Sequence, residues 1–343
     1  MINYALPTLF QVRKKKRPVI SPLSLVKADK KVDNKVKKQV YDVALCEGPV
    51  LINNMAPEFA IDWKESGDVQ KAFGWPNLKQ ELRVRTAIEG ENRRALENQL
   101  FAYEMIVPEN DVAWYASLDL ADVPATERSD VVAEFQSLLA QGVTGLGKTK
   151  AYTRIDLLAE PTIAKAHQSK DGVWIITLQT PALLCDPDEL TAQKQFDAAS
   201  QLHQAYAEVW QQLSNGQLQL ERFFATQSLA GGYYLWKRFQ KTMAYQPYLL
   251  TDAGSVFVLK STTDNNVEAQ KIIQKWLEQG LPLPGWAITK YQLGKEEHDY
   301  WAHCPYIRHN GYGEIAVNLS IHWDNKPPQM KEIELIQQTE GLA

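Results

Sequence analysis

Alternating apolar and polar residues mark the strands that the sequence predicts in the first half of the chain. Such alternation sends successive side chains to opposite faces of a strand, so that one face can be buried. Strands are predicted at residues 82–86, 101–107, 112–120 and 152–158. Between the last two, apolar residues from Val131 to Leu139 recur at helical spacing, which predicts a helix with Ser129 as its N-cap and an end near Gly142.

The second half follows a similar order of elements. Strands are predicted at 173–178, 255–259 and 315–319, helices at 188–213 and 267–277, and a glycine-rich loop at Gly311 before the last strand. A helix, a glycine-rich loop and a strand therefore occur twice, which is a weak internal repeat. The pattern predicts an α+β fold made of two related ferredoxin-like or RRM-like domains.

Charge separates the N-terminal segment from the rest of the chain. Residues 13–38 contain eleven Lys or Arg and two Asp, a charge of +9 in a chain whose total charge is −4. Such a segment attracts a polyanion or a partner locally, and the alternative is a solvated tail. We predict a basic arm at 1–40, in which no helix or strand is assigned, a first domain at 41–165, a second domain at 166–325 and a C-terminal tail at 326–343.

Cysteine usage and hydropathy bear on the compartment. The three cysteines, Cys46, Cys185 and Cys304, are odd in number and far apart, and neither a signal peptide nor a run of eighteen apolar residues occurs. We therefore expect a cytoplasmic protein with reduced thiols.

One segment matches the P-loop expression of nucleotide-binding proteins. Residues 142–149 fit G-x-x-x-x-G-K-[ST] completely. In a P-loop a strand enters the loop and a helix leaves it, whereas here a predicted helix enters and a predicted strand leaves. We therefore expect a polynucleotide backbone as the ligand, and the alternative is a turn with solvated cations. The predicted RNA-binding residues here are Gly145, Gly147, Lys148, Thr149, Lys150 and Arg154.

Two further segments combine aromatic rings, cations and glycines. In the first, rings stack bases while Arg and backbone N–H groups hold phosphates, and its predicted RNA-binding residues are Tyr306, Arg308, His309, Asn310, Gly311 and Tyr312. A tight hairpin whose tyrosines cap the core is the alternative. The second follows two glycines and contributes Trp236, Lys237 and Arg238, with a helix face packed in the core as its alternative.

Four arginines lie in and beside the first pair of predicted strands. Alternation places Arg83 and Arg85 on one face, and like charges side by side on a sheet are unfavourable unless an anion lies between them. With Arg93 and Arg94 they are predicted to contact phosphates, and an ordinary solvated face is the alternative.

Metal and catalytic patterns are weak. The spacing of His298, His303, Cys304 and His309 fits no zinc pattern, so we predict neither a metal nor a cofactor. No nucleophile with a paired base is found. Acid–base cleavage of RNA by His303 or His309 stays open, because a bound histidine needs only geometry and a suitable pKa.

Taken together, these segments resemble the RAMP superfamily of CRISPR-associated proteins, and more narrowly the Csx-ten family of type III-D systems in the Cas-five group. The resemblance covers residues 40–320 and is carried by residues 83–88 with 99–104, by 146–150, and more specifically by the GSVF strand at 254–259 and the NGYGE loop at 310–314. The segment PGS-x-LRGA, with which that family usually opens, is missing. The first domain is therefore expected to be incomplete in this chain and completed by a separate polypeptide.

The resemblance implies a structural role without nuclease activity. Such subunits hold the 5′ handle of the CRISPR RNA and dock the large polymerase-domain subunit to the backbone of RAMP subunits, with target RNA as an indirect partner. The alternatives are a backbone subunit of the Cas-seven type, which cleaves target RNA with a metal-dependent Asp and would make the protein an enzyme, and a P-loop NTPase.

Overall fold

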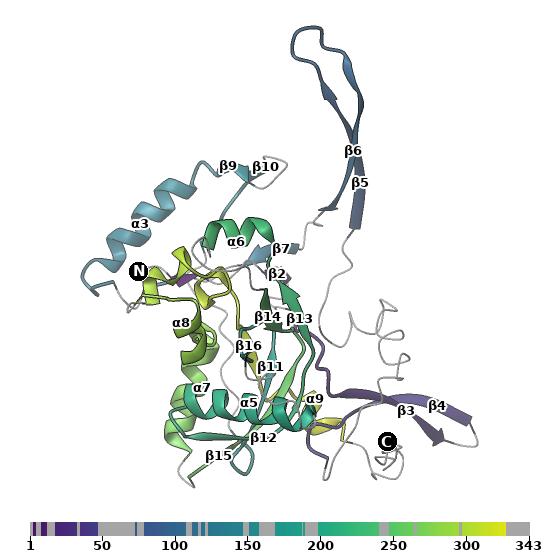
Figure 1. Cartoon of the computed structure of the whole chain (residues 1–343), viewed down its shortest axis with the longest axis vertical. Coiled ribbons are helices and arrows are strands. Elements are labelled where there is room, and N and C mark those ends of the chain that lie inside the picture. Colours follow the sequence, from purple (N-terminus) through teal and green to yellow (C-terminus); the bar gives the residue numbers. More distant parts are fainter. Residues whose placement is uncertain are drawn as a thin grey trace. The chain divides into compact units, whose positions relative to one another are not determined.

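The computed structural model describes residues 3–4, 8–11, 18–32, 35–46, 73, 79–107, 112–115, 118–120, 123–146, 151–157, 169–186, 188, 198–239, 247–263, 266–294 and 297–326 (Figure 1). The chain divides into two compact units. The larger comprises Met1–Leu6, Ile20–Phe59 and Ala116–Ala343, and the smaller comprises Pro7–Val19 and Ala60–Tyr115.

A four-stranded antiparallel sheet is the centre of the larger unit. Its strands lie in the order β12 (Leu218–Phe224), β15 (Val256–Ser261), β11 (Val173–Leu178) and β16 (Ile315–Val317). Helix α5 (Ala198–Leu213) joins β11 to β12, and α7 (Val267–Gln279) joins β15 to β16. Because β15 lies between β11 and β12, the unit has the split β-α-β arrangement with a second β-α-β connection beside it.

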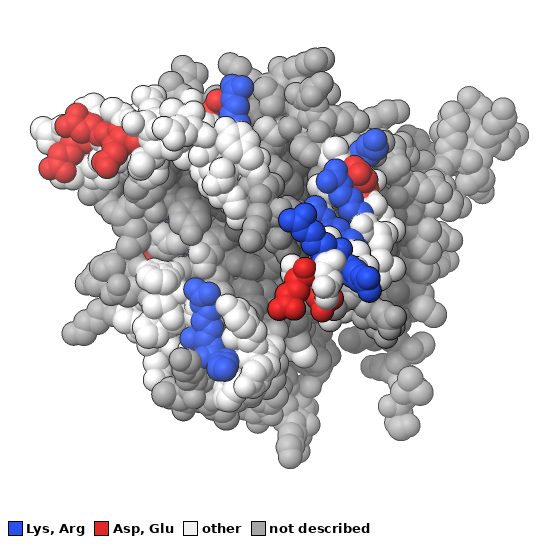
Figure 2. Space-filling model, turned by 90° about the horizontal axis from the view of Figure 1, so that it is seen from above, with Lys and Arg blue, Asp and Glu red and all other residues white. Residues whose placement is uncertain are grey.

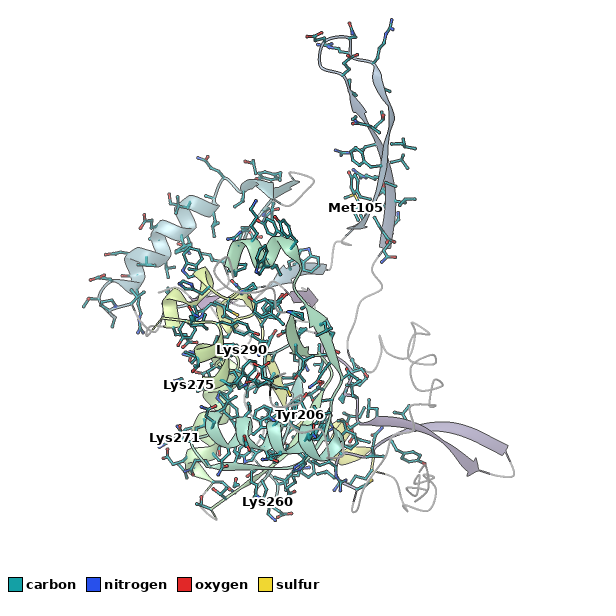
Figure 3. All side chains as sticks on the ribbon, in the orientation of Figure 1. Met105, Tyr206, Lys260, Lys271, Lys275 and Lys290 are labelled. Carbon is teal, nitrogen blue, oxygen red and sulfur yellow. The ribbon has the colours of Figure 1, made fainter. Side chains whose placement is uncertain are left out.

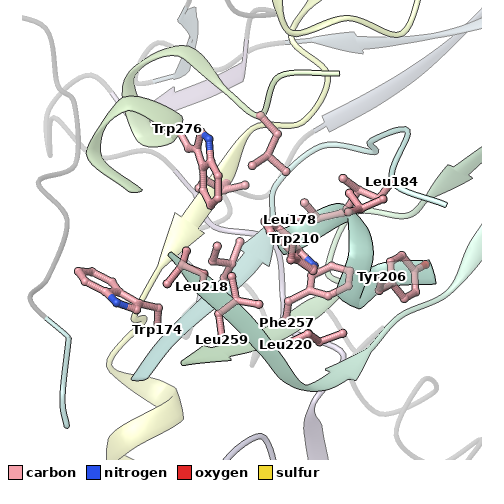
Figure 4. Packing of buried hydrophobic residues seen from close by; sticks show 14 of the residues in the cluster. Trp174, Leu178, Leu184, Tyr206, Trp210, Leu218, Leu220, Phe257, Leu259 and Trp276 are labelled. Atoms are coloured by element: carbon pink, nitrogen blue, oxygen red, sulfur yellow. The ribbon is translucent and has the colours of Figure 1, made fainter. Parts of the chain in front are cut away.

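Strict alternation along β11 sends its large side chains to both faces of the sheet. Trp174, Ile176 and Leu178 are fully buried on the helix side, where they share a core with Phe257 and Leu259. Helices α5 and α7 close this core with aromatic rings (Figure 4). The rings of Tyr206 and Phe257 and of Trp210 and Phe257 have centroids 5.0 Å apart, and those of Trp210 and Trp276 are 5.7 Å apart.

The opposite face of the sheet is covered as well. Ile175, Val256 and Val258 pack there against Val43 and Ala44 of the segment that precedes the sheet in the chain. Phe224 joins them because a register shift in β12 between Leu220 and Arg222 moves the end of that strand to this face. RRM modules stack bases on an open sheet face, and in this unit that face is occupied by protein.

A buried polar network fastens this cover to the sheet. The Asp42 Oδ2 atom lies 2.8 Å from His322 Nδ1, and His322 Nε2 lies 3.1 Å from Thr177 Oγ1. Asp42 also accepts hydrogen bonds from the Ser24 hydroxyl at 3.0 Å and the Ala44 N–H at 2.8 Å. The side chains of Asp42, His322, Thr177 and Ser24 are all fully buried. The network joins the end of β4 (Lys35–Asp42), helix α9 (Ile321–Asp324) and the central strand β11.

A second apolar cluster lies beyond the end of the sheet. It contains Tyr248, Tyr291 and Tyr306. The centroid of the Tyr248 ring lies 4.8 Å from that of the Tyr291 ring and 4.8 Å from that of the Tyr306 ring. The elements around it are β13 (Gln227–Ala230), β14 (Tyr248–Thr251), α8 (Gly285–Lys290), η1 (Glu297–Ala302) and η2 (Arg308–Asn310). Lys290 at the end of α8 pairs with Asp186 at 3.1 Å, and both side chains are largely buried.

The remaining described strands form two-stranded ladders. In the larger unit these are β1 (Asn3–Tyr4) with β8 (Leu118–Asp119), β3 (Leu25–Val32) with β4, and β9 (Val143–Leu146) with β10 (Ala151–Thr153); in the smaller unit they are β2 (Thr8–Gln11) with β7 (Val112–Tyr115) and β5 (Lys79–Ile88) with β6 (Ala95–Val107). Helices α3 (Arg128–Leu139) and α6 (Tyr233–Phe239) complete the described elements.

The helices and strands predicted from the sequence agree best with the structure in the second half of the chain. The predicted strand 173–178 is β11, and the predictions 255–259, 267–277 and 315–319 fall on β15, α7 and β16. The predicted helix 188–213 falls on α5 only from residue 198, since 189–197 lie outside the described residues.

Several predictions about the first half were wrong in detail. The basic segment at 1–40 contains strands, including the β3–β4 hairpin. Ser129 lies inside α3, whose N-cap is Glu127 without a side-chain cap bond. Before residue 158 the described strands form only two-stranded ladders, so the predicted first RRM-like domain is not assembled by the described residues. The predicted domain boundaries stay predictions.

None of the described helices is long and apolar enough to cross a membrane.

Replacement of Asp42 tests the network. We expect Asp42→Ala to lower the free energy of unfolding by roughly 3–5 kcal/mol, because His322, Ser24 and the Ala44 N–H lose a buried acceptor together. Urea unfolding followed by tryptophan fluorescence measures the change. As a control, Lys271→Ala removes only the exposed pair with Glu268 and should cost about 0–1 kcal/mol. Equal effects of the two variants would contradict a stabilising role for the network.

Candidate nucleic-acid interface

The β5–β6 hairpin sorts its side chains into two faces of different chemistry. Residues that pair across an antiparallel ladder share a face, and the pairing alternates between faces along the strands. We call one the cationic face; its pairs are Lys79 with Val107, Glu81 with Met105, Arg83 with Tyr103 and Arg85 with Phe101. We call the other the apolar face; its pairs are Gln80 with Ile106, Leu82 with Glu104, Val84 with Ala102 and Thr86 with Leu100, and the register shifts before the last pair, Ile88 with Ala95. Side chains extend from both sides of the ribbon (Figure 3).

The cationic face brings two guanidinium groups beside two aromatic rings. The Arg85 guanidinium lies 5.3 Å from the centroid of the Tyr103 ring, a cation–π distance. Arg83 Nε lies 3.1 Å from Glu81 Oε1, and both side chains are about half exposed, so this pair contributes little and leaves the cation accessible. Phe101 is 48% exposed. The predicted placement of Arg83 and Arg85 on one face is confirmed.

The sequence interpretation missed the two rings on this face. Phe101 and Tyr103 alternate with Ala102 and Glu104, so their parity was visible in the sequence. What was not visible is the register, which sets Arg83 opposite Tyr103 and Arg85 opposite Phe101. The hairpin therefore offers ring faces and positive charge to one ligand.

Arg93 and Arg94 lie in the turn of the hairpin and not on its cationic face. The Arg93 N–H donates to the Glu89 carbonyl at 3.0 Å, and Arg93 adopts a positive φ of 52°. Both arginines are exposed, as are the acidic residues Glu89 and Glu91 beside them. Figure 2 shows the same mixture, with Lys and Arg lying among Asp and Glu within one group of charged side chains. The turn is therefore a mixed-charge site.

The P-loop-like segment has the predicted reversed context. Helix α3 precedes it, and the strand that leaves it, β10, pairs antiparallel with β9. Gly145 lies in β9 with a φ of 78°. Because a strand follows, none of the described residues around this segment forms a helix N-terminus directed at a phosphate. Within residues 142–146 the glycine-rich loop is in part a strand, and Gly147, Lys148, Thr149 and Lys150 lie outside the described residues.

Two side chains define the described part of this hairpin. The Tyr152 hydroxyl donates to the Gln141 carbonyl at 3.1 Å, and its ring covers Gly142, where an added Cβ would lie 2.5 Å from the Tyr152 oxygen. Gly142 also has a φ of 71°, a conformation that favours glycine, and any Cβ there would have to displace the exposed Tyr152 ring. Arg154 is 79% exposed and pairs with exposed Asp156 at 3.1 Å, which leaves its guanidinium accessible to an anion.

Trp236, Lys237 and Arg238 lie on α6 and not in a glycine-rich loop. The Tyr233 and Trp236 ring centroids are 5.6 Å apart on one side of this helix, and Tyr233 is highly exposed. Residues two apart on a helix do not face each other, so Trp236 and Arg238 are not placed to hold one base between them. The Arg238 guanidinium lies 5.1 Å from the Phe239 ring centroid instead.

The loop at 306–312 is mainly part of the fold. The largely buried Arg308 guanidinium pairs with Glu297, with Nε 2.5 Å from Oε1 and Nη2 2.6 Å from Oε2, and it donates to Gln279 Oε1 at 3.3 Å. A charge held by two carboxylate oxygens and an amide is largely neutralised toward other anions. The arrangement supports a structural role for Arg308 more than the predicted phosphate contact.

The neighbours of Arg308 are held in the same way. Tyr306 is buried and its ring meets the Tyr312 ring edge-on, with centroids 5.0 Å apart. Asn310 donates to the Pro305 carbonyl at 2.9 Å, and the Gly311 carbonyl accepts from Thr180 Oγ1 at 2.8 Å. The half-buried His309 lies in η2 between them. These contacts favour the alternative in which the tyrosines cap the core.

The histidines and the cysteine near this loop differ in their exposure to solvent. Cys304 is fully buried, and desolvation raises its pKa to about 12, so its thiol stays protonated at neutral pH. Within the described ranges no cluster of three or more His, Cys, Asp or Glu is arranged to hold a metal ion. The His298 side chain lies outside the described residues, and His303 is exposed.

Comparison with known proteins gives only distant matches. No protein-family model and no curated protein matches this chain. Among solved structures, the chain is similar to a subunit of the type III-B Cmr-beta complex bound to cognate target RNA and AMPPnP, with 11% identity, 78% of this chain and 75% of that chain covered, and a TM-score of 0.32. It is also similar to a chain of the Csm3–Csm4 subcomplex of the type III-A CRISPR-Cas interference complex, with 12% identity, 78% and 80% coverage, and a TM-score of 0.31. At such TM-scores the likeness does not locate a site.

The reversed context of the P-loop-like segment predicts no response to nucleotide. We expect ATP with Mg²⁺ to leave the melting temperature unchanged and to be recovered intact, because a strand start cannot hold a triphosphate as a helix N-terminus does. Thermal unfolding and phosphate release measure both quantities. ATP turnover, or stabilisation lost in Lys148→Ala, would contradict the interpretation.

The contact between Gly142 and Tyr152 predicts a local effect. We expect Gly142→Ala to destabilise the β9–β10 hairpin by at least about 1 kcal/mol, since an L-residue is strained at positive φ and its Cβ meets the ring. Hydrogen exchange of the residue 143–146 amides should then accelerate about fivefold or more. Gly90→Ala is the matched control, because an added Cβ there meets nothing within 4 Å. Unchanged exchange in Gly142→Ala would contradict the required close approach.

Proposed function

We propose that this chain is a non-catalytic, RNA-binding subunit of a type III CRISPR effector ribonucleoprotein, in which it holds the CRISPR RNA near its 5′ handle and docks neighbouring subunits. The observation that carries the RNA-binding part is the cationic face of the β5–β6 hairpin, where Arg83 and Arg85 lie opposite Tyr103 and Phe101. Its partners would be the CRISPR RNA, RAMP backbone subunits and the large polymerase-domain subunit.

The chemistry of this face suits single-stranded RNA. Guanidinium groups neutralise phosphates, and exposed rings stack bases without requiring a particular sequence. By its paired residues the face carries Lys79, Arg83 and Arg85 against Glu81, a net charge of +2, while the apolar face carries only Glu104. RNA would therefore approach the hairpin from the cationic side.

The assignment to the RAMP superfamily rests on the sequence motifs and on the split β-α-β arrangement. This arrangement is that of ferredoxin-like and RRM-like domains, and we infer that the larger unit contains one such domain. The GSVF motif supplies buried core residues of β15. The NGYGE motif supplies the loop before β16, in which the Gly311 carbonyl accepts a hydrogen bond from Thr180. The two more specific motifs thus support a fold, whereas the hairpin supports the binding.

The cationic face predicts how RNA binding changes on mutation. We expect Arg83→Ala with Arg85→Ala to weaken binding of a single-stranded RNA about tenfold at 0.1 M salt. The slope of log K against log salt should fall by about 1.4, because each lost phosphate contact on a single strand removes about 0.7. Fluorescence anisotropy over a salt series measures both values.

A matched control removes the same charge elsewhere. Lys271→Ala with Lys275→Ala takes two exposed cations from α7 (Figure 3) and should leave affinity and slope nearly unchanged. Equal losses in the two double variants would leave only general electrostatics and contradict the proposed site. Bound RNA should stay intact with Mg²⁺ or Mn²⁺, and metal-dependent cleavage abolished by one Asp→Ala change would favour the target-cleaving alternative.

A further inference from the structure

The apolar face of the β5–β6 hairpin exposes aliphatic side chains that no described residue covers. Leu82 is 68% exposed, Val84 56%, Ile88 64% and Leu100 73%. Leu82, Val84 and Leu100 share one face by register, while Ile88 lies beyond a register shift of the ladder. Among the described strands, β5 and β6 pair only with each other. Contiguous exposed aliphatic residues mark an interaction surface more often than scattered ones do. A two-stranded hairpin is also only marginally stable in water until one face is covered.

RNA does not fit this face. The paired residues that form it include one acidic residue, Glu104, and neither Lys nor Arg. They also include no aromatic ring on which a base could stack. A polyanion would meet a carboxylate without compensation there, so the occupant is a protein surface.

The same face of a second copy of the chain fits poorly as well. Two apolar faces packed together would cover both Glu104 carboxylates and offer no cation to either, whatever their relative orientation. A carboxylate removed from water without a partner costs several kcal/mol. The face therefore requires a partner whose apolar surface carries a Lys or Arg at the position that meets Glu104.

We propose that the apolar face, with Leu82, Val84 and Leu100 around Glu104, docks a different protein through an aliphatic surface that contains a basic residue. The two faces of one hairpin then hold RNA on one side and a protein subunit on the other. This inference extends the proposed function by naming the docking surface and the chemistry of its partner, but it does not depend on RNA binding by the cationic face.

Site-specific photocrosslinking in cells that naturally contain the protein separates the two faces. The full chain carries the photoreactive residue benzoylphenylalanine in place of Val84 on the apolar face or, as the matched control, in place of adjacent Arg85 on the cationic face. We expect Val84→benzoylphenylalanine to give an adduct with a different polypeptide that resists ribonuclease. Mass spectrometry should place the crosslinked peptide of the partner beside a Lys or Arg. Adding Glu104→Lys should lower the adduct yield at least tenfold, and adding Glu104→Gln should lower it less.

Four outcomes of the crosslinking experiment would overturn the inference. An adduct of position 84 with RNA, an adduct with a second copy of the chain, or no adduct would overturn the inference. So would a yield that is indifferent to Glu104→Lys. A ribonuclease-sensitive adduct at position 85 supports the proposed function separately, and its absence together with a protein adduct at position 84 would overturn the RNA site while leaving the docking surface supported. Circular dichroism of each purified variant verifies that the chain is folded.

Discussion

Asp42 accepts hydrogen bonds from three segments of the larger unit at once, and the rest of the arrangement depends on this junction. Its carboxylate meets His322 near the end of the described chain, Ser24 before β3 and the backbone after β4, while His322 contacts Thr177 in the central strand. Residues from both ends of the unit are thereby held on one face of the sheet, and α5 and α7 cover the other. A sheet buried on both faces has no surface left for stacking bases, so the RNA of the proposed function would bind to elements outside the sheet.

The β5–β6 hairpin offers such an element because of the two-residue period of a strand. Successive side chains point to opposite sides, and this sequence places its arginines on odd positions and its aliphatic residues on even ones. The register then sets rings beside the arginines and a single carboxylate among the aliphatic residues. One short ribbon thus presents two surfaces of different chemistry, suited to two different kinds of partner.

Local patterns in the sequence were sufficient for strands such as β5, β6, β11 and β15 and for the shared face of Arg83 and Arg85, because alternation is a local property. A helix at α6 was only the alternative, since Gly231 and Gly232 before it favoured a close approach to RNA, and the structure shows that helix. The structural role of Arg308 was missed because it depends on Glu297 and Gln279, which only the fold brings near. The packing of Val43 and Ala44 against the sheet was not predicted either. The lysine-rich segment before Asp42 suggested a solvated arm, and the apolar residues that cover the sheet face are too few to form a pattern in the sequence.

In the proposed function, RNA lies against the rings of Phe101 and Tyr103. Ultraviolet light can crosslink a uridine-containing single-stranded RNA to the full chain, and mass spectrometry then identifies the peptides that carry a nucleotide. This measurement reports which side chains touch a base. The account predicts adducts on the peptide that contains Phe101 and Tyr103. Adducts confined to other peptides, such as the one that contains Tyr233 and Trp236, would contradict it.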